Sequence, residues 1–136
     1  MTGAFVFDAA GFLMSAPALW TTGSYLAVAG VATGMLAAIP GAIDFIYTVP
    51  PKSSGRKRAI KHMLLMISAM VIFALSRWIR GDAANPPDIV LLGLEGIGVI
   101  ALMIGAWHGG TLVSRNQVSV DHRYANAGKW KDESVA

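Results

Sequence analysis

The sequence predicts an all-α protein: an integral membrane bundle of four transmembrane helices, the first of which is short. The residues from Ile89 to Val113 form an apolar run of 25 residues that carries one charge, Glu95. A run of that length is sufficient for a helix to cross the roughly 30 Å hydrocarbon core of a bilayer. The chain is 54% hydrophobic and 14% charged, whereas about 25% of the residues in an average soluble domain are charged. The protein is therefore expected to fold in lipid.

Prolines and short polar stretches divide the chain into four apolar segments. The predicted helices cover about residues 3–19, 24–49, 59–79 and 89–113. The first is expected to end at Pro17 and the polar residues that follow, and the second at Pro50-Pro51, because proline cannot continue a helix. These helices form one transmembrane domain, residues 1–114, followed by a polar cytoplasmic tail, residues 115–136.

Basic residues indicate how the bundle is oriented in the membrane. Nine of them flank the loop between the second and third helices or lie in the tail: Lys52, Arg56, Lys57, Arg58, Lys61, Arg115, Arg123, Lys129 and Lys131. The opposite side has Arg77 and Arg80, with Asp82 and Asp88 nearby. The positive-inside rule then places the loop and both termini in the cytoplasm, in the inner membrane of a bacterium. The start of the chain lacks the basic residues of a signal peptide, so the first helix is expected to be retained.

The residues at the predicted membrane surfaces agree with this orientation. Arg56, Lys57 and Arg58 are expected at the inner lipid head groups. Trp20 and Trp78 are expected at the outer interface, where aromatic side chains collect. The net charge of +3 is attributed to contact with lipid rather than with nucleic acid, because the basic residues lie beside apolar segments.

Small residues recur on one face of the second helix. Gly30, Gly34 and Gly41 lie along this face, and Gly105 and Gly109 form a similar pair on the fourth helix. In lipid, helices associate by close backbone approach, and small residues four positions apart are typical of such contacts. These glycines are predicted to pack helices together, with a partner helix that is either internal or part of another protein.

Asp44 ends the small-residue face, so its carboxylate is expected to point into the bundle. Charged residues inside a membrane are costly and mark functional sites by default. His62 and His108 lie at a similar inner depth on the predicted topology, so Asp44, His62 and His108 form a candidate intramembrane polar cluster. Each member also has a structural interpretation: a salt bridge from Asp44 to Arg58 or Lys61, an interfacial position for His62, and a packing role for His108.

Two further acidic residues lie in the apolar segments. Asp8, on the first helix, is expected nearer the inner side of the membrane. Glu95 is expected near the outer surface and apart from the polar cluster, where it pairs with Arg77 or Arg80 or faces a second protein.

The sequence does not predict a cofactor outright. His62 shares a face with Met66, Met70 and Phe73, an apolar wall that suits haem b, although such a stripe is also ordinary core material. A quinone needs little more than an apolar cleft and one hydrogen-bond donor. The chain has no cysteine, no His-Glu-x-x-His motif and no phosphate-binding glycine loop, so neither a metal site nor enzymatic catalysis is expected.

Several segments resemble a known family. The segment LAVAGVATGMLAAIPGAIDF, residues 26–45, is similar to the second helix of a bacterial membrane family catalogued as domain of unknown function 2231. Lys61-His62, Ala74-Leu75-Ser76 and the segment GAWHGGTLV, residues 105–113, are similar as well. The resemblance extends from about Phe5 to Val120 and implies a four-helix membrane domain often met near electron-transfer proteins.

This chain departs from the family pattern at two places. Family members usually begin with a His-Pro-x-x-Val-His-Phe-Pro motif, which is missing here, and they tend to have a histidine where this chain has Asn116. Any haem or metal role of those histidines in relatives is therefore not implied for this chain.

Together these observations predict a small accessory subunit that acts by helix packing in a larger membrane energy-conversion complex, respiratory or photosynthetic. Its expected partners are membrane lipids and other membrane-protein subunits. Two alternatives stay open: an electron-transfer protein that binds haem b or quinone near His62 and His108, and a proton or small-solute pathway through Asp44.

Overall fold

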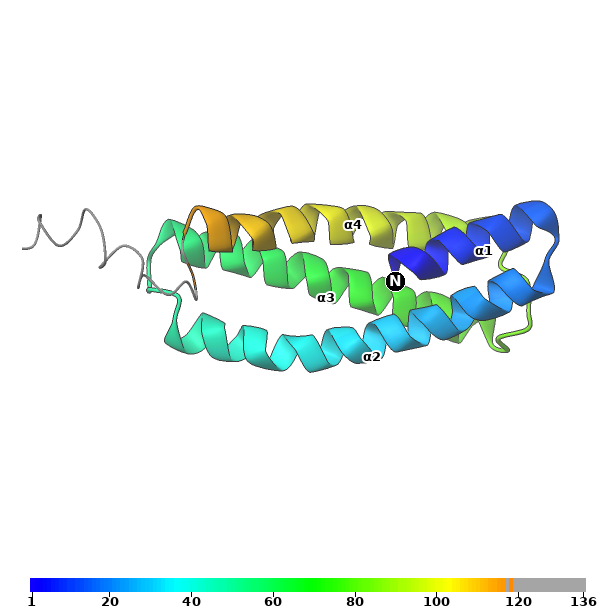
Figure 1. Cartoon of the computed structure of the whole chain (residues 1–136), viewed down its shortest axis with the longest axis horizontal. Coiled ribbons are helices and arrows are strands. Elements are labelled where there is room, and N and C mark those ends of the chain that lie inside the picture. Colours follow the sequence, from blue (N-terminus) through cyan, green and yellow to red (C-terminus); the bar gives the residue numbers. More distant parts are fainter. Residues whose placement is uncertain (117, 119–136) are drawn as a thin grey trace, which may run out of the picture.

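The computed structural model describes residues 1–116 and residue 118, and this part of the chain is entirely helical apart from its turns and loops (Figure 1). Its helices are α1 (Thr2–Met14), α2 (Pro17–Tyr47), α3 (Ser54–Arg80) and α4 (Ile89–Ser114). The all-helical class and the short first helix agree with the prediction. Most of the predicted tail, residues 117 and 119–136, lies outside the described residues.

Three of the helices are long and apolar enough to cross a membrane. They are α2, α3 and α4, with 31, 27 and 26 residues. By contrast α1 has 13 residues, and at 1.5 Å per residue it extends about 20 Å, which is less than the hydrocarbon thickness. The structure thus has three candidate spans and a short first helix that packs beside them, and a membrane crossing by the first helix stays a prediction.

The boundary between the first two helices differs from the expected one. We expected the first helix to reach residue 19, but α1 ends at Met14 and Ser15 adopts a left-handed conformation with φ 50°. Pro17 begins α2 instead of ending α1. The physical reason is that the first turn of a helix does not need the N–H group that proline lacks, and the fixed φ of proline suits that position. Trp20 to Gly23 are therefore helical.

Side-chain caps set the beginning of the other two helices. The Ser53 hydroxyl accepts a hydrogen bond from the Arg56 amide at 3.1 Å, so α3 begins at Ser54, earlier than the expected 59. The Asp88 carboxylate accepts from the Leu91 amide at 2.8 Å and starts α4 at Ile89, as expected. Such caps satisfy amide groups that have no partner inside the helix.

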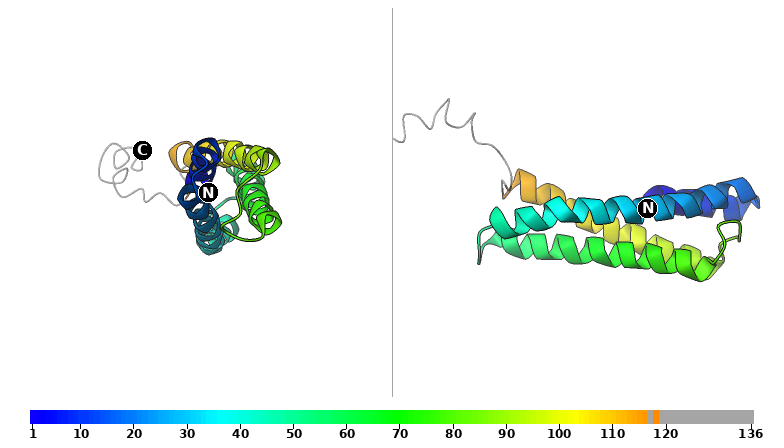
Figure 2. Two further views of the ribbon diagram at one scale, coloured as in Figure 1. Left: turned by 90° about the vertical axis from the view of Figure 1, so that its right-hand side faces the viewer. Right: turned by 90° about the horizontal axis from the view of Figure 1, so that it is seen from below.

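The helices form two antiparallel pairs, α1 with α2 and α3 with α4, and α1 also contacts α4. The views in Figure 2 show the helices running roughly along one axis, with α1 confined to the end at which it joins α2. The core at this end contains Ala4, Ala27 and the fully buried ring of Phe73. Gly98 lies under that ring: a Cβ atom there would be 2.9 Å from Cε2 of Phe73.

The short first helix leaves the bundle closed at one end and open at the other. Met1 lies beside Gly30, near the middle of α2, where an added Cβ would be 2.6 Å from the Met1 nitrogen. Met1 thus lies at mid-bundle, and the cytoplasmic location of both termini stays a prediction. Which end of the bundle faces the cytoplasm stays a prediction. We refer to the end with α1 as the closed end and to the end with the α2–α3 loop as the open end.

Close approach of α1 to α2 depends on Gly11. A Cβ atom at Gly11 would lie 2.8 Å from the backbone nitrogen of Trp20, whereas one at Gly93 would meet nothing within 4 Å. We predict that Gly11→Val lowers the unfolding free energy by about 1–3 kcal/mol, as overpacking does, and that Gly93→Val changes it much less. Unfolding of both variants in mixed micelles would measure this, and equal stability of the two would contradict the packing of α1.

Candidate functional site

At the closed end, a cluster of polar side chains is buried between the helices. It contains Asp8 of α1, Ser76 and Arg80 of α3, and Glu95 of α4, which we call the ionic cluster. Asp8, Arg80 and Glu95 are only 0%, 6% and 2% exposed. Asp8 Oδ1 lies 2.9 Å from Arg80 Nη2, the only ion pair between side chains in the described part of the chain.

Contacts within the ionic cluster connect every helix. The Ser76 hydroxyl donates to Glu95 Oε1 at 2.8 Å, and the carboxyl group of Glu95 lies beside that of Asp8. Arg80 Nη1 also donates to the backbone carbonyl of Trp20 in α2 at 3.2 Å. A charged group in an apolar interior is tolerated only with such partners, so the four helices are held in one register here.

The local sequence explains why these side chains meet. Ser76 and Arg80 are four residues apart on α3, so they share one face of the helix. Gly23 provides room for Asp8, because a Cβ atom there would be 2.6 Å from the carboxyl carbon of Asp8. The Trp20 indole donates to the Ala84 carbonyl at 2.9 Å and so joins α2 to the α3–α4 loop above the cluster.

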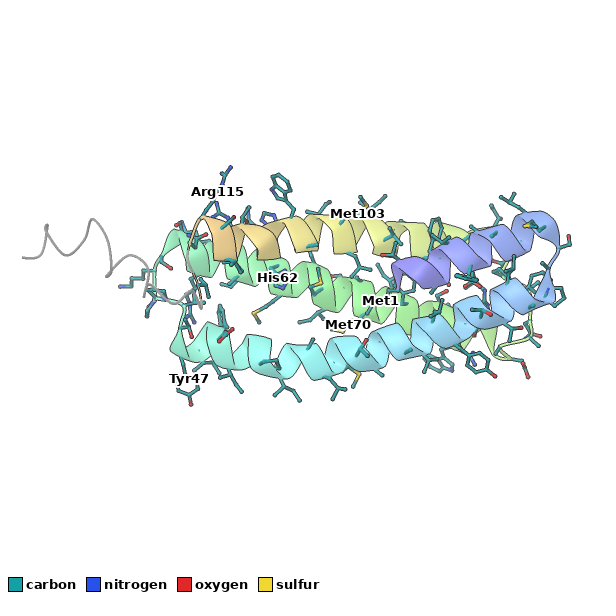
Figure 3. The ribbon with its side chains drawn as sticks, in the orientation of Figure 1. Met1, Tyr47, His62, Met70, Met103 and Arg115 are labelled. Carbon is teal, nitrogen blue, oxygen red and sulfur yellow. The ribbon has the colours of Figure 1, made fainter. Side chains whose placement is uncertain are left out.

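The open end contains an apolar cavity of about 630 Å³ between α2 and the α3–α4 pair. On the α2 side its wall is built from small residues: Gly34, Ala37, Ala38, Gly41 and Ala42. Methionines form much of the opposite wall, and Met1 and Met70 close it toward α1, as the sticks in Figure 3 show. Apolar cavities of 300–1,000 Å³ with a few polar groups are typical of ligand sites.

Asp44 and His62 are the only titratable side chains among the residues that line the cavity. His62 Nδ1 lies 2.8 Å from the Gly105 carbonyl oxygen. Because a carbonyl can only accept, Nδ1 carries the hydrogen and Nε2 is the bare nitrogen of the neutral ring. The ring packs on Gly109, where a Cβ atom would be 2.9 Å from Cε1. A histidine oriented in this way can accept a hydrogen bond or bind an iron or zinc ion through Nε2.

The structure brings together only part of the predicted polar cluster. Asp44 and His62 line one cavity, but His108 is not among its lining residues. Asp44 forms no ion pair with Arg58 or Lys61 in the described residues; the Arg58 guanidinium instead donates to the Asn116 side chain. No group of three histidine or acidic residues in the described chain is close enough to hold a metal ion. The predicted pathway through Asp44 stays a prediction.

Most of the predicted packing glycines lie at internal helix contacts. Gly30 and Gly34 of α2 contact Met1 and Met70, while Gly105 and Gly109 of α4 lie against Leu65, Met66 and His62 of α3. Gly41 is different, since an added Cβ there would meet nothing within 4 Å. The small-residue face of α2 is thus used internally in its first half and left unpaired in its second half.

Residues of the predicted surface belts serve different purposes. Trp78 is 79% exposed, as expected for an interfacial residue, but Trp20 is partly buried and caps the ionic cluster. Arg56 lies over the ring of Phe45, 4.4 Å from its centre, which is a cation–π contact between α2 and α3 at the open end. Lys57 is exposed at the same end.

A family model described as "Predicted membrane protein (DUF2231)" matches residues 1–122. The chain belongs to this family. The match covers the ionic cluster, the cavity and all four helices, and it agrees with the three candidate spans. We therefore describe this DUF2231 chain as a multi-pass membrane protein. Searches of curated proteins and of solved structures gave no significant match.

Sequence reasoning missed the ionic cluster of this DUF2231 chain. Asp8 was expected near the inner side, with Asp44, which is wrong: it lies at the other end of the bundle, next to Arg80. Glu95 was expected to pair with Arg77 or Arg80 or to face a second protein. In the structure Asp8 forms the ion pair with Arg80, Glu95 accepts from Ser76, and Arg77 donates to the Gly81 carbonyl. A signal was present, because Asp8 lies six residues before the end of α1 and Glu95 six residues after the start of α4, which places them at one depth.

The ion pair at the closed end leads to a stability prediction. Removal of one partner from a buried ion pair leaves the other group either charged without compensation or forced to take up a proton, and such a loss typically costs about 3–5 kcal/mol. We therefore expect Arg80→Ala to destabilise the bundle by that amount and to expose α1 to protease. Arg77 lies one turn away from Arg80 and is partly exposed. Arg77→Ala should therefore lower the unfolding free energy by less than about 1 kcal/mol. Unfolding in mixed micelles compares the two, and similar losses would contradict the role of the pair.

Proposed function

We propose that this DUF2231 chain is a small accessory subunit that receives a transmembrane helix of a larger membrane complex in its open-end cavity. One observation supports this above all others: the second half of α2 presents glycine and alanine to a cavity that no helix of the described chain fills. Small residues favour close helix approach in lipid, where apolar burial alone gives little driving force.

The position of the cavity also fits a helix from another protein. The cavity lies between α2 and the α3–α4 pair, beyond the point where Met1 packs beside Gly30. Ala37, Ala38, Gly41 and Ala42 are all exposed in the isolated chain. A helix laid along these residues would complete a four-helix cross-section at the open end.

The distribution of charge supports an orientation with the open end in the cytoplasm of a bacterium. Lys52, Arg56, Lys57, Arg58 and Lys61 lie at the open end. At the closed end Arg80 is buried in an ion pair, which leaves Arg77 as the basic side chain available at that surface among the described residues. The positive-inside rule then favours the open end as the cytoplasmic one.

The family resemblance supports the choice of complex. It implies occurrence near electron-transfer proteins, so we propose a respiratory or photosynthetic complex as the partner. The subunit then acts by packing, and its open end lies in the inner leaflet of the inner membrane.

A photocrosslinking experiment tests the docking of a partner helix. A photoreactive amino acid at Ala38, in the cavity wall, should form an adduct with a transmembrane segment of another subunit in native membranes. The same group at Ala32, which is exposed on α2 but outside the cavity, should not select that segment. Ala38→Trp should abolish co-purification of the same subunit, while Ala32→Trp retains it. Crosslinks to lipid alone from both positions would contradict the proposal.

A second candidate function rests on His62. Its bare Nε2 and the surrounding apolar walls suit a lipid-soluble ligand with a hydrogen-bonding head, such as a quinone, or a haem b bound through one axial histidine. Among the described residues His62 is the only histidine that lines the cavity, which favours the quinone, because haem ligation from both sides needs a second histidine.

The visible spectrum and an organic extract of protein purified in mild detergent separate the two functions. A Soret band, or a quinone recovered in proportion to protein and lost in His62→Ala but not in His108→Ala, would support the ligand-binding function. For the accessory-subunit proposal we expect a colourless protein with no such ligand and with the partner helix bound.

A further inference from the structure

The ionic cluster contains more acidic groups than basic ones. Asp8 and Glu95 contribute two carboxyl groups, while Arg80 contributes the single guanidinium within reach. All three side chains are more than nine-tenths buried. With every group ionised the cluster would have a net negative charge inside an apolar bundle, where an unpaired charge is strongly disfavoured.

Among the described residues, no other charged side chain forms an ion pair with the cluster. From α2, Gly23 packs against Asp8, and the backbone carbonyl of Trp20 accepts a hydrogen bond from Arg80. From α3 the cluster receives Ser76 and Arg80, and from α4 it receives Glu95. The nearest further cation, Arg77, donates to the Gly81 carbonyl. Asp82 and Asp88 are exposed and accept from backbone amides of the α3–α4 loop and α4.

The carboxyl oxygens of the cluster also lack hydrogen-bond donors. Glu95 Oε1 accepts from Ser76, but Glu95 Oε2 and Asp8 Oδ2 are buried and have no hydrogen-bond donor in the described part of the chain. The two carboxyl groups are nevertheless in contact with each other. Two ionised carboxylates only accept and repel each other, whereas a proton between them makes one a donor and the other an acceptor.

We propose that Asp8 and Glu95 share one proton, so that the ionic cluster is a neutral proton-binding site with one carboxylate paired to Arg80. The proton replaces the missing second cation, and it satisfies the two orphaned oxygens at once. Arg80 is the last residue of α3, so the site lies next to the α3–α4 loop.

Infrared spectroscopy in a detergent without carbonyl groups can count the protonated carboxyls. Exchange into deuterium oxide shifts the C=O stretch of a protonated carboxyl, and isotope-labelled standards calibrate its intensity. The number of protonated carboxyls should equal the number of cluster acids minus the number of cluster cations. The wild-type protein should therefore have one, Glu95→Gln none, Asp8→Asn none and Arg80→Gln two.

Two controls separate this site from other carboxyls and from misfolding. Asp44→Asn, which removes an exposed acid at the open end, should leave the band unchanged. Ser76→Ala should keep one protonated carboxyl but move its band to higher frequency, because the C=O group loses its hydrogen-bond donor. If Arg80→Gln does not fold, the two conservative acid variants still decide the question. Absence of the band in the wild-type protein, or its survival in both Glu95→Gln and Asp8→Asn, would overturn the proposal.

Discussion

The ion pair between Asp8 and Arg80 is the constraint on which the rest of the bundle depends. In the described chain α1 has 13 residues, fewer than a membrane span needs, and the burial of apolar side chains alone provides little association energy in lipid. A buried carboxylate in that medium must have a partner. The partner is on α3, bonds to α2, and is in contact with α4 through the acids and Ser76, so one polar cluster fixes the depth and rotation of every helix.

This tether makes the two ends of the molecule different. At the closed end, α1 fills the space between α2 and α4, and glycines at 11, 23 and 98 permit contacts that larger residues would prevent. Beyond Met1 no helix of the described chain continues that layer. The same kind of small-residue face that packs internally on one half of α2 is therefore presented to a cavity on the other half. The packed part of α2 and the part that lines the cavity therefore lie on one helix.

The long helices could be predicted from the sequence because a membrane requires long apolar runs. The ionic cluster could not, because it depends on how the helices are aligned with one another. The thickness of the hydrocarbon core requires long apolar runs, so α3 and α4 are visible in the sequence. Pro17 was expected to end the first helix, but it begins α2. The sequence alone could not show this, because the turn at Ser15 depends on how closely Gly11 approaches Trp20. Because α1 ends at Met14 instead of residue 19, Asp8 lies six residues from the closed end of the bundle. Helical phase alone could place Asp44 and His62 near one another, but it could not show that His108 lies outside the cavity lining.

The most direct test of the account is the accessibility of α2 along its length in the isolated protein. The chain contains no cysteine, so single cysteines can be placed at Ala27, Ala32 and Ala38 and their reaction rates with a membrane-permeant thiol reagent compared. Ala27 is 3% exposed beneath α1, while Ala32 and Ala38 are exposed. The account predicts that Ala38→Cys reacts at a rate similar to Ala32→Cys and far faster than Ala27→Cys. If Ala38→Cys were as protected as Ala27→Cys, the open end would be closed by the chain itself and the account would be contradicted.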